Sequence, residues 1–139
     1  MTSTDVRRVR LRWAGEGLVF HGGPDDGAQI IVDSSGNEGQ TPMQLLLMAL
    51  GGCMAVDVCM ILEKSRVPVK SLEVEVVGIR ASDAPRRFVS LDLIYRIGGP
   101  GGEHQARLER AIKLSREKYC SVLHTLDPEI EFDVRIECV

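Results

Sequence analysis

The stretch TPMQLLLMALGGCMAVDVCMIL, residues 41–62, decides the fold of this chain. It opens with Thr41 and Pro42, a capping hydroxyl followed by a proline at the first helical position, which is typical of a helix start. We expect the helix to run to about Arg66. Asp57 is the only charged residue in the quoted stretch. A helix that is apolar on all sides is typical of a protein core, so the sequence predicts a long, buried central helix.

The same stretch is also close to a membrane span in length, since a span needs roughly 18 or more apolar residues. A span would expose Gly51-Gly52, Cys53, Asp57 and Cys59 to lipid and would stand alone between strand-like segments. We therefore expect burial in protein and no membrane partner. A chain of 139 residues has little other material to surround such a helix. Packing against the same helix of a second subunit would supply the cover, so we expect a two-fold homodimer.

Length and composition limit the classes of function. A chain of 139 residues and 15.3 kDa fits a single domain, residues 1–139. Hydrophobic residues make up 44% and aromatic ones 4%, so the core must be aliphatic. A net charge of −3 lacks the basic footprint of nucleic-acid binding, and we expect no nucleic-acid partner. The start MTSTDVRRVRLRW has no apolar signal region, which favours a reducing cytoplasm with the four cysteines as thiols.

The rest of the chain reads as strands together with a second helix. Alternating apolar residues bounded by Gly, Pro and Asp are typical of strands joined by turns. One face of the second helix, at spacings near 3.6 residues, consists of Leu108, Ala111, Ile112, Ser115, Tyr119 and Val122-Leu123. This order of elements predicts an α+β fold. The expected elements are an antiparallel meander (9–12, 18–20 and 30–32), the central helix, a β-hairpin (72–80 and 88–97), a second helix from Glu103 to about Asp127, and a final strand (130–136).

Catalytic candidates reduce to the cysteines, because the sequence has no Ser-His-Asp spacing, HExxH motif or CxxC motif. Cys53 follows Gly51-Gly52 directly, and Asp57 lies one turn later on the same face of the helix. Cys59 is about 240° round the helix from Cys53, so these two cannot form a disulfide. Cys138 is the penultimate residue, where chains commonly fray.

Cys120 lies near the end of the second helix, and His124 follows one turn later. Three interpretations stay open for this thiol. It could be a small buried hydrophobe, its thiolate and the imidazole could share a metal, or the imidazole could lower the pKa of the thiol. A metal would need further ligands, and the remaining histidines, His21 and His104, lie in turn-like segments. We therefore expect no metal.

The segment TPMQLLLMALGGC (41–53), the following AVDV (55–58) and the distant Tyr119-Cys120 resemble the OsmC/Ohr family of osmotically inducible and organic hydroperoxide resistance proteins. The order of elements is similar too, over nearly the whole chain. The resemblance implies an intertwined α+β homodimer with the cysteine-bearing helices at its centre. It also implies a thiol peroxidase that reduces small apolar hydroperoxides, with Cys53 as peroxidatic and Cys120 as resolving cysteine. No cofactor would be bound, and an external dithiol or lipoyl-type reductant would regenerate the thiols.

The chain departs from that family where charge is needed. Peroxidase members carry an arginine in the N-terminal strands and a glutamate just after the proline that opens the central helix. Here the corresponding residues are Ala14-Gly15-Glu16-Gly17 and Met43-Gln44. Arg10 or Arg12 could substitute, although a solvated role on exposed strand faces is the simpler expectation. The alternative function is therefore a non-catalytic dimer that binds a small apolar or thiol-reactive ligand.

The peroxidase interpretation makes geometric demands. The Cα atoms of Cys53 and Cys120 should lie within about 7 Å, which is the reach of a disulfide. Cys59 and Cys138 should lie outside the pocket. Asp57 should raise the pKa of the neighbouring thiol unless a cation neutralises the carboxylate.

Overall fold

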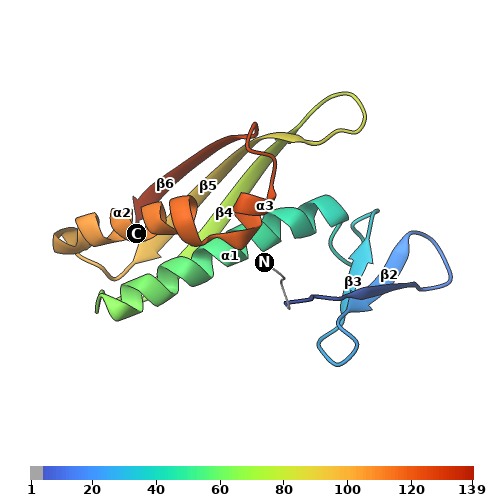
Figure 1. The fold of residues 1–139 in the computed structure, drawn as a ribbon, viewed down its shortest axis with the longest axis horizontal. Coiled ribbons are helices and arrows are strands. Elements are labelled where there is room, and N and C mark those ends of the chain that lie inside the picture. Colours follow the sequence, from blue (N-terminus) through green and yellow to red (C-terminus); the bar gives the residue numbers. More distant parts are fainter. Residues whose placement is uncertain (1–4) are drawn as a thin grey trace. The chain divides into compact units, whose positions relative to one another are not determined.

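The computed structural model describes residues 5–139, shown as a ribbon in Figure 1. The described chain divides into two compact units, with the boundary between Leu46 and Leu47, and each is described here by itself. Helices and strands occur together in the predicted order, which confirms the α+β class. A single domain over residues 1–139 stays a prediction.

The N-terminal unit is a three-stranded antiparallel sheet in the order β1-β2-β3, which confirms the predicted meander. Its strands are short and largely exposed. Arg10 donates two hydrogen bonds to the carboxylate of Asp25, at 2.9 and 3.0 Å, so this guanidinium is engaged within its own unit. The strands are β1 (Arg10–Trp13), β2 (Val19–Gly23) and β3 (Ile30–Asp33).

A buried carboxylate organises the loop that leaves β3. Asp33 accepts hydrogen bonds from the backbone N–H groups of Ser35, Asn37 and Glu38 and from the Ser35 hydroxyl. The Ser35 hydroxyl and these backbone donors stabilise the charged form, and they lower the pKa of Asp33 to about 2. The loop conformation therefore depends on an ionised carboxylate.

The central helix α1 (Pro42–Lys64) begins where the sequence predicts. Thr41 and Gln44 form a capping box: the Gln44 N–H donates to the Thr41 hydroxyl, and the Gln44 side chain accepts from the Thr41 N–H. The helix ends at Lys64, two residues before the predicted Arg66, and Arg66 itself adopts a positive φ of 56°. A residue in this left-handed conformation cannot continue a right-handed helix.

Within one chain, α1 is buried on one face only. Its buried side chains are four residues apart, at Leu50, Met54, Val58 and Leu62. The opposite face is also apolar but is exposed, with Met48, Val56 and Met60 at 60%, 58% and 54%. By length and composition α1 could cross a membrane, and only 28% of its most apolar window is buried in the chain. The expected burial on all sides is therefore absent from the single chain.

The C-terminal unit has a second sheet in the order β4-β5-β6. The predicted hairpin is present as β4 (Ser71–Arg80) antiparallel to β5 (Phe88–Gly98), while β6 (Glu131–Cys138) runs parallel to β5. The helices lie on one face of this sheet (Figure 1), where the inward side chains of β5 are buried. On the opposite face Arg96 forms ion pairs with three carboxylates, from Glu73, Glu75 and Glu137.

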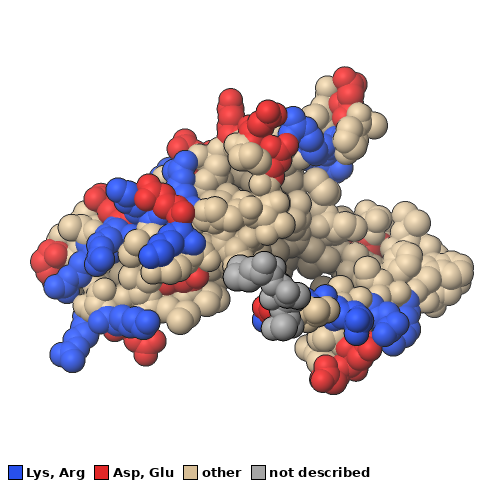
Figure 2. Space-filling model, in the orientation of Figure 1, with Lys and Arg blue, Asp and Glu red and all other residues tan. Residues whose placement is uncertain are grey.

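The second helix is interrupted, contrary to the continuous helix predicted from Glu103 to about Asp127. A 3-10 turn (Gly102–His104) leads into α2 (Gln105–Leu114), a wide π-helical turn follows (Ser115–Tyr119), and the chain is extended at Cys120 before the short α3 (Ser121–Thr125). At the interruption the Cys120 sulfur caps α3 by accepting a hydrogen bond from the Leu123 N–H at 3.4 Å. Charged side chains of both signs gather over the α2 end of this unit (Figure 2).

Candidate functional site

Three side chains that could carry chemistry meet inside the C-terminal unit. The sulfur atoms of Cys53 and Cys120 and a carboxylate oxygen of Asp57 all lie within 4.8 Å of one another. Cys53 and Asp57 come from successive turns of α1, and Cys120 comes from the break before α3. The structure thus brings together the two cysteines and the acid that the sequence singled out. Whether the cysteine Cα atoms lie within about 7 Å stays a prediction.

The two thiols differ in exposure. Cys53 is half-buried, whereas Cys120 is completely buried. Burial raises the pKa of Cys120 to about 11, the N–H of Leu123 opposes this shift, and the hydrogen bond and charge of Cys53 add to it, followed by the charge of Asp57. Cys120 is therefore a neutral thiol near pH 7, and Cys53 is the thiol that a molecule from solvent can reach.

Asp57 is held by a residue that the sequence did not indicate as functional. The hydroxyl of Ser115, which is fully buried, donates a hydrogen bond of 2.8 Å to Oδ2 of Asp57. Ser115 opens the π-helical turn, 58 residues away along the chain. The sequence signal that could have indicated Ser115 is its position on the apolar face of the predicted second helix, because a buried hydroxyl group needs a hydrogen-bond partner.

Tyr95, on β5, is a second residue that sequence reasoning missed. Its side chain is fully buried, and its hydroxyl has no hydrogen-bond partner among the described residues. Burial raises the pKa of Tyr95, and electrostatic interactions with Cys120, Asp57, Cys59 and Cys53 raise it further. The ring therefore lies in the electrostatic surroundings of the thiols, on the helix-covered face of the sheet.

The other candidates lie outside this cluster. Cys59 is exposed on α1, and Cys138 is exposed on β6, where its sulfur faces the Gln105 side chain at 3.8 Å. The ring nitrogens of His124 face the backbone carbonyls of Cys120 and Glu117, at 2.7 and 3.2 Å. The imidazole is thus engaged by the backbone instead of by the thiol, so the structure does not support a Cys120–His124 metal site or thiol activation by His124.

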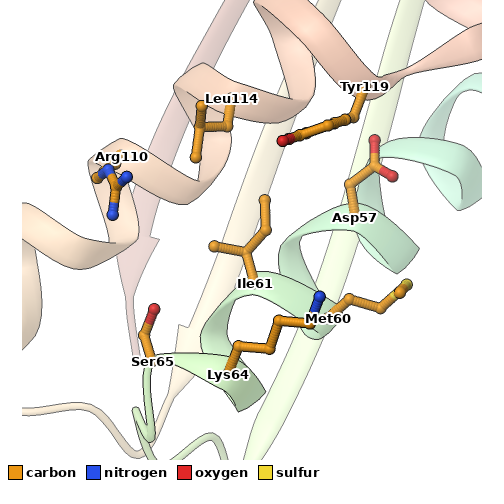
Figure 3. A pocket seen from close by; sticks show the side chains of 8 residues that line it. All are labelled: Asp57, Met60, Ile61, Lys64, Ser65, Arg110, Leu114 and Tyr119. Atoms are coloured by element: carbon orange, nitrogen blue, oxygen red, sulfur yellow. The ribbon is translucent and has the colours of Figure 1, made fainter.

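A cavity of about 470 Å³ adjoins the cluster through Asp57 (Figure 3). Asp57 and Tyr119 lie together at one end of it, and Lys64 and Arg110 add positive charge to its wall. The lining is mostly apolar in area, so the cavity suits a small molecule with an apolar body. Its lining residues are Asp57, Met60, Ile61, Lys64, Ser65, Arg110, Leu114 and Tyr119.

The fold and the cluster define a class of α+β proteins in which a long central helix presents a cysteine to a second cysteine from a later segment. Residues 35–135 match the family model described as OsmC-like protein. The chain belongs to the OsmC-like family, as the resemblance in sequence predicted.

Individual relatives agree with this assignment. The chain is 39% identical over 133 residues to Protein YhfA of Escherichia coli K12, which covers 95% of this chain and 98% of that protein. Its fold is similar to that of an OsmC-like protein from Mycoplasma pneumoniae (TM-score 0.83, 16% identity, 99% of each chain). It is also similar to the fold of an organic hydroperoxide resistance protein from Elizabethkingia anophelis (TM-score 0.67, 14% identity, 100% of each chain). At these identities the two structures establish the shared fold.

Proposed function

We propose that this chain is a thiol-dependent peroxidase that reduces organic hydroperoxides. The observation that carries the proposal is the meeting of two thiols from distant segments, one half-exposed and one buried, within 4.8 Å. Two cysteines so placed suit a peroxidatic and a resolving role. The membership of an organic hydroperoxide resistance protein in the same fold group adds support.

In the proposed reaction the half-exposed thiol of Cys53 reacts first and the buried thiol of Cys120 reacts second. The Cys53 thiolate attacks the terminal peroxide oxygen; an S–O bond forms, the O–O bond breaks, and the alkoxide leaves as an alcohol after taking a proton. The Cys120 sulfur then attacks the Cys53 sulfur, the S–O bond breaks, and water leaves with the Cys120 proton. An external dithiol reduces the resulting disulfide by exchange and becomes a disulfide itself.

Asp57 is not at the position of either the arginine or the glutamate that peroxidase members of the family carry and this chain lacks. It is the charged member of the cluster, and Ser115 holds one of its oxygens. A carboxylate so placed can accept the thiol proton and return it to the departing alkoxide. It also repels the thiolate, so we expect slower turnover than in relatives that have both charged partners.

We also propose that the protein is a homodimer through the exposed face of α1. Met48, Gly52, Val56 and Met60 are spaced by four residues and form one exposed apolar stripe. Covering such a stripe removes apolar surface from water, a gain of about 25 cal/mol per Å². Sedimentation at micromolar concentration should show a species of two chains; a stable folded monomer there would contradict this proposal.

The test of the peroxidase function is consumption of cumene hydroperoxide with a dithiol reductant. Cys53→Ser should abolish it, and Cys120→Ser should stop disulfide formation while one oxidation equivalent per chain is still consumed. Cys59→Ser and Cys138→Ser are matched controls outside the cluster and should keep wild-type turnover. If Cys53→Ser equals the wild type, the proposed function is wrong.

The cavity beside Asp57 favours a second function, the binding of a small apolar or thiol-reactive molecule without turnover. A wild-type protein that consumes no peroxide, yet binds an apolar fluorescent probe that Ile61→Trp displaces, would establish this function instead. We place the protein in the reducing cytoplasm, because peroxide reduction needs free thiols.

A further inference from the structure

The cluster of Cys53, Asp57 and Cys120 has the composition of a metal site as well as that of a redox site. Two sulfur atoms and a carboxylate oxygen converge within 4.8 Å. In a tetrahedral zinc site with Zn–S bonds of about 2.3 Å and a Zn–O bond of about 2.0 Å, two sulfur ligands are about 3.8 Å apart, and a sulfur and an oxygen ligand are about 3.5 Å apart. Side-chain rotations that move these atoms together by at most about 1.3 Å would therefore close the cluster around one ion.

We propose that the reduced protein binds one thiophilic divalent cation per chain, of the Zn²⁺ class, through Cys53, Cys120 and Asp57. Two thiolates and one carboxylate carry three negative charges against the two positive charges of the ion. Soft sulfur ligands select Zn²⁺, Cd²⁺ or Co²⁺ over Mg²⁺ and Ca²⁺, which prefer oxygen. Three protein ligands leave one coordination position open, an arrangement typical of zinc sites that react with small molecules.

The surroundings of Asp57 suit a ligand. Ser115 donates to Oδ2, which orients the carboxylate and leaves Oδ1 for the ion. Hydrogen bonds of this kind fix metal ligands, and their loss commonly costs about 10- to 100-fold in metal affinity. The Ser115 hydroxyl is fully buried, and Asp57 is half-buried beside the cavity.

The Tyr95 hydroxyl is an independent observation that favours the site. It is fully buried and has no hydrogen-bond partner among the described residues. Buried hydroxyl groups are nearly always paired, so such a group calls for a partner. Tyr95 interacts electrostatically with Cys120, Asp57 and Cys53, so its hydroxyl lies in the surroundings of the cluster, where a metal-bound water would donate and accept hydrogen bonds.

Metal binding and peroxide reduction would compete for the same sulfur atoms. An ion bound to both thiolates occupies the electron pairs that attack the peroxide oxygen, so Zn²⁺ should inhibit peroxide consumption. The two proposals can still fail separately. Metal binding is measured without peroxide, and peroxide consumption is measured with a chelator present.

The experiment is a titration of the reduced, metal-free full chain with Zn²⁺ in competition with a chromophoric chelator, together with Co²⁺ absorption spectra. We expect one ion per chain and an intense thiolate-to-cobalt charge-transfer band. Cys120→Ser and Asp57→Asn should each weaken Zn²⁺ binding at least tenfold, and Ser115→Ala should weaken it by about 10- to 100-fold. Cys59→Ser and Cys138→Ser are the matched controls and should bind as the wild type does.

Several results would overturn the proposal. One is a wild-type protein without the charge-transfer band at saturating Co²⁺, a result that needs no variant to fold. Another is Zn²⁺ affinity that is unchanged in Asp57→Asn, or is lost equally in Cys59→Ser, since both would place the ion elsewhere. Far-ultraviolet circular dichroism of every variant ensures that weaker binding is scored only on folded protein.

Discussion

The contact between α1 and β4 at Gly51 makes a prediction about stability whose size follows from the structure. A Cβ atom built on Gly51 would lie 2.8 Å from Cγ2 of Val76, closer than real methyl contacts, and 3.6 Å from Cγ1 of Val74. A Cβ on the next residue, Gly52, would meet nothing within 4 Å. Two adjacent glycines in one helix therefore differ in packing while sharing the same backbone conformation.

Gly51→Ala has two opposing effects on the free energy of unfolding. Alanine is a better helix former than glycine by about 1 kcal/mol, whereas forcing a methyl group against Val76 costs about 1–3 kcal/mol. Val76→Ala removes the Cγ2 methyl group that the Cβ atom introduced by Gly51→Ala would overlap. In the Val76→Ala background, Gly51→Ala should therefore turn from neutral or destabilising to stabilising. The expected coupling between the two substitutions is about 1–3 kcal/mol.

The assay is urea denaturation followed by circular dichroism at one fixed protein concentration, for the wild type, both single variants and the double variant. The matched control is the same cycle built on Gly52→Ala. Its coupling to Val76→Ala should stay within about 0.5 kcal/mol, as for sites without a shared contact. The coupling is the difference between the effect of the glycine substitution in the wild type and its effect in Val76→Ala. An effect of the glycine substitution on dimer formation that is the same in both backgrounds therefore cancels from the coupling. Equal coupling at Gly51 and Gly52 would refute the proposed packing of α1 on β4.

Three other predictions concern the charged and buried groups. Ser115→Ala removes the hydrogen bond to the Asp57 carboxylate and should lower the free energy of unfolding by about 1.5–3 kcal/mol. The control Ser121→Ala, at an exposed serine, should lower it by less than about 0.5 kcal/mol. An equal loss in both variants would contradict the contact. Asp33, whose pKa is lowered to about 2, stabilises the fold above its unfolded pKa of about 3.9, and this stabilisation is lost as the pH falls through about 2. In chemical denaturation across this pH window, the free energy of unfolding should fall less steeply with decreasing pH in Asp33→Asn than in the wild type. Equal slopes in the two proteins would contradict the role of Asp33. Burial raises the pKa of Cys120 to about 11. The rate at which Cys120 is alkylated, followed by mass spectrometry, should therefore still rise with pH at about pH 10. A rate that levels off just above about pH 8.5, the ordinary thiol pKa, would contradict this prediction.

Local sequence patterns account for most of the secondary structure. Apolar alternation predicted both parts of the β-hairpin, because successive side chains of a strand point to opposite faces. The Thr41-Pro42 start of α1 followed from capping chemistry, which involves residues within one helical turn. The juxtaposition of Cys53 and Asp57 was equally predictable, because residues four apart on a helix share a face.

The break in the second helix lay beyond this reasoning. Residues 103–127 have a continuous amphipathic pattern, and no Gly or Pro interrupts the segment around Cys120. The chain nevertheless widens at Ser115 and becomes extended at Cys120. In this conformation the Ser115 hydroxyl bonds Asp57, and the Cys120 sulfur caps α3. The hydrogen bond to α1 and the local cap of α3 thus outweigh a weak local preference for continuing the helix.

The sequence by itself determined the class of fold, the central helix and the shared helix face of Cys53 and Asp57, because each depends on the spacing of side chains along a few turns or strands. Only the tertiary structure decided that Cys120 meets Cys53, that Ser115 holds Asp57, and that Tyr95 is buried on the same side of the sheet. These residues come from separate elements, and their approach depends on how α1 and the segment before α3 pack on the β4-β5-β6 sheet. Packing of this kind is set by the sum of many long-range contacts, which no local pattern encodes.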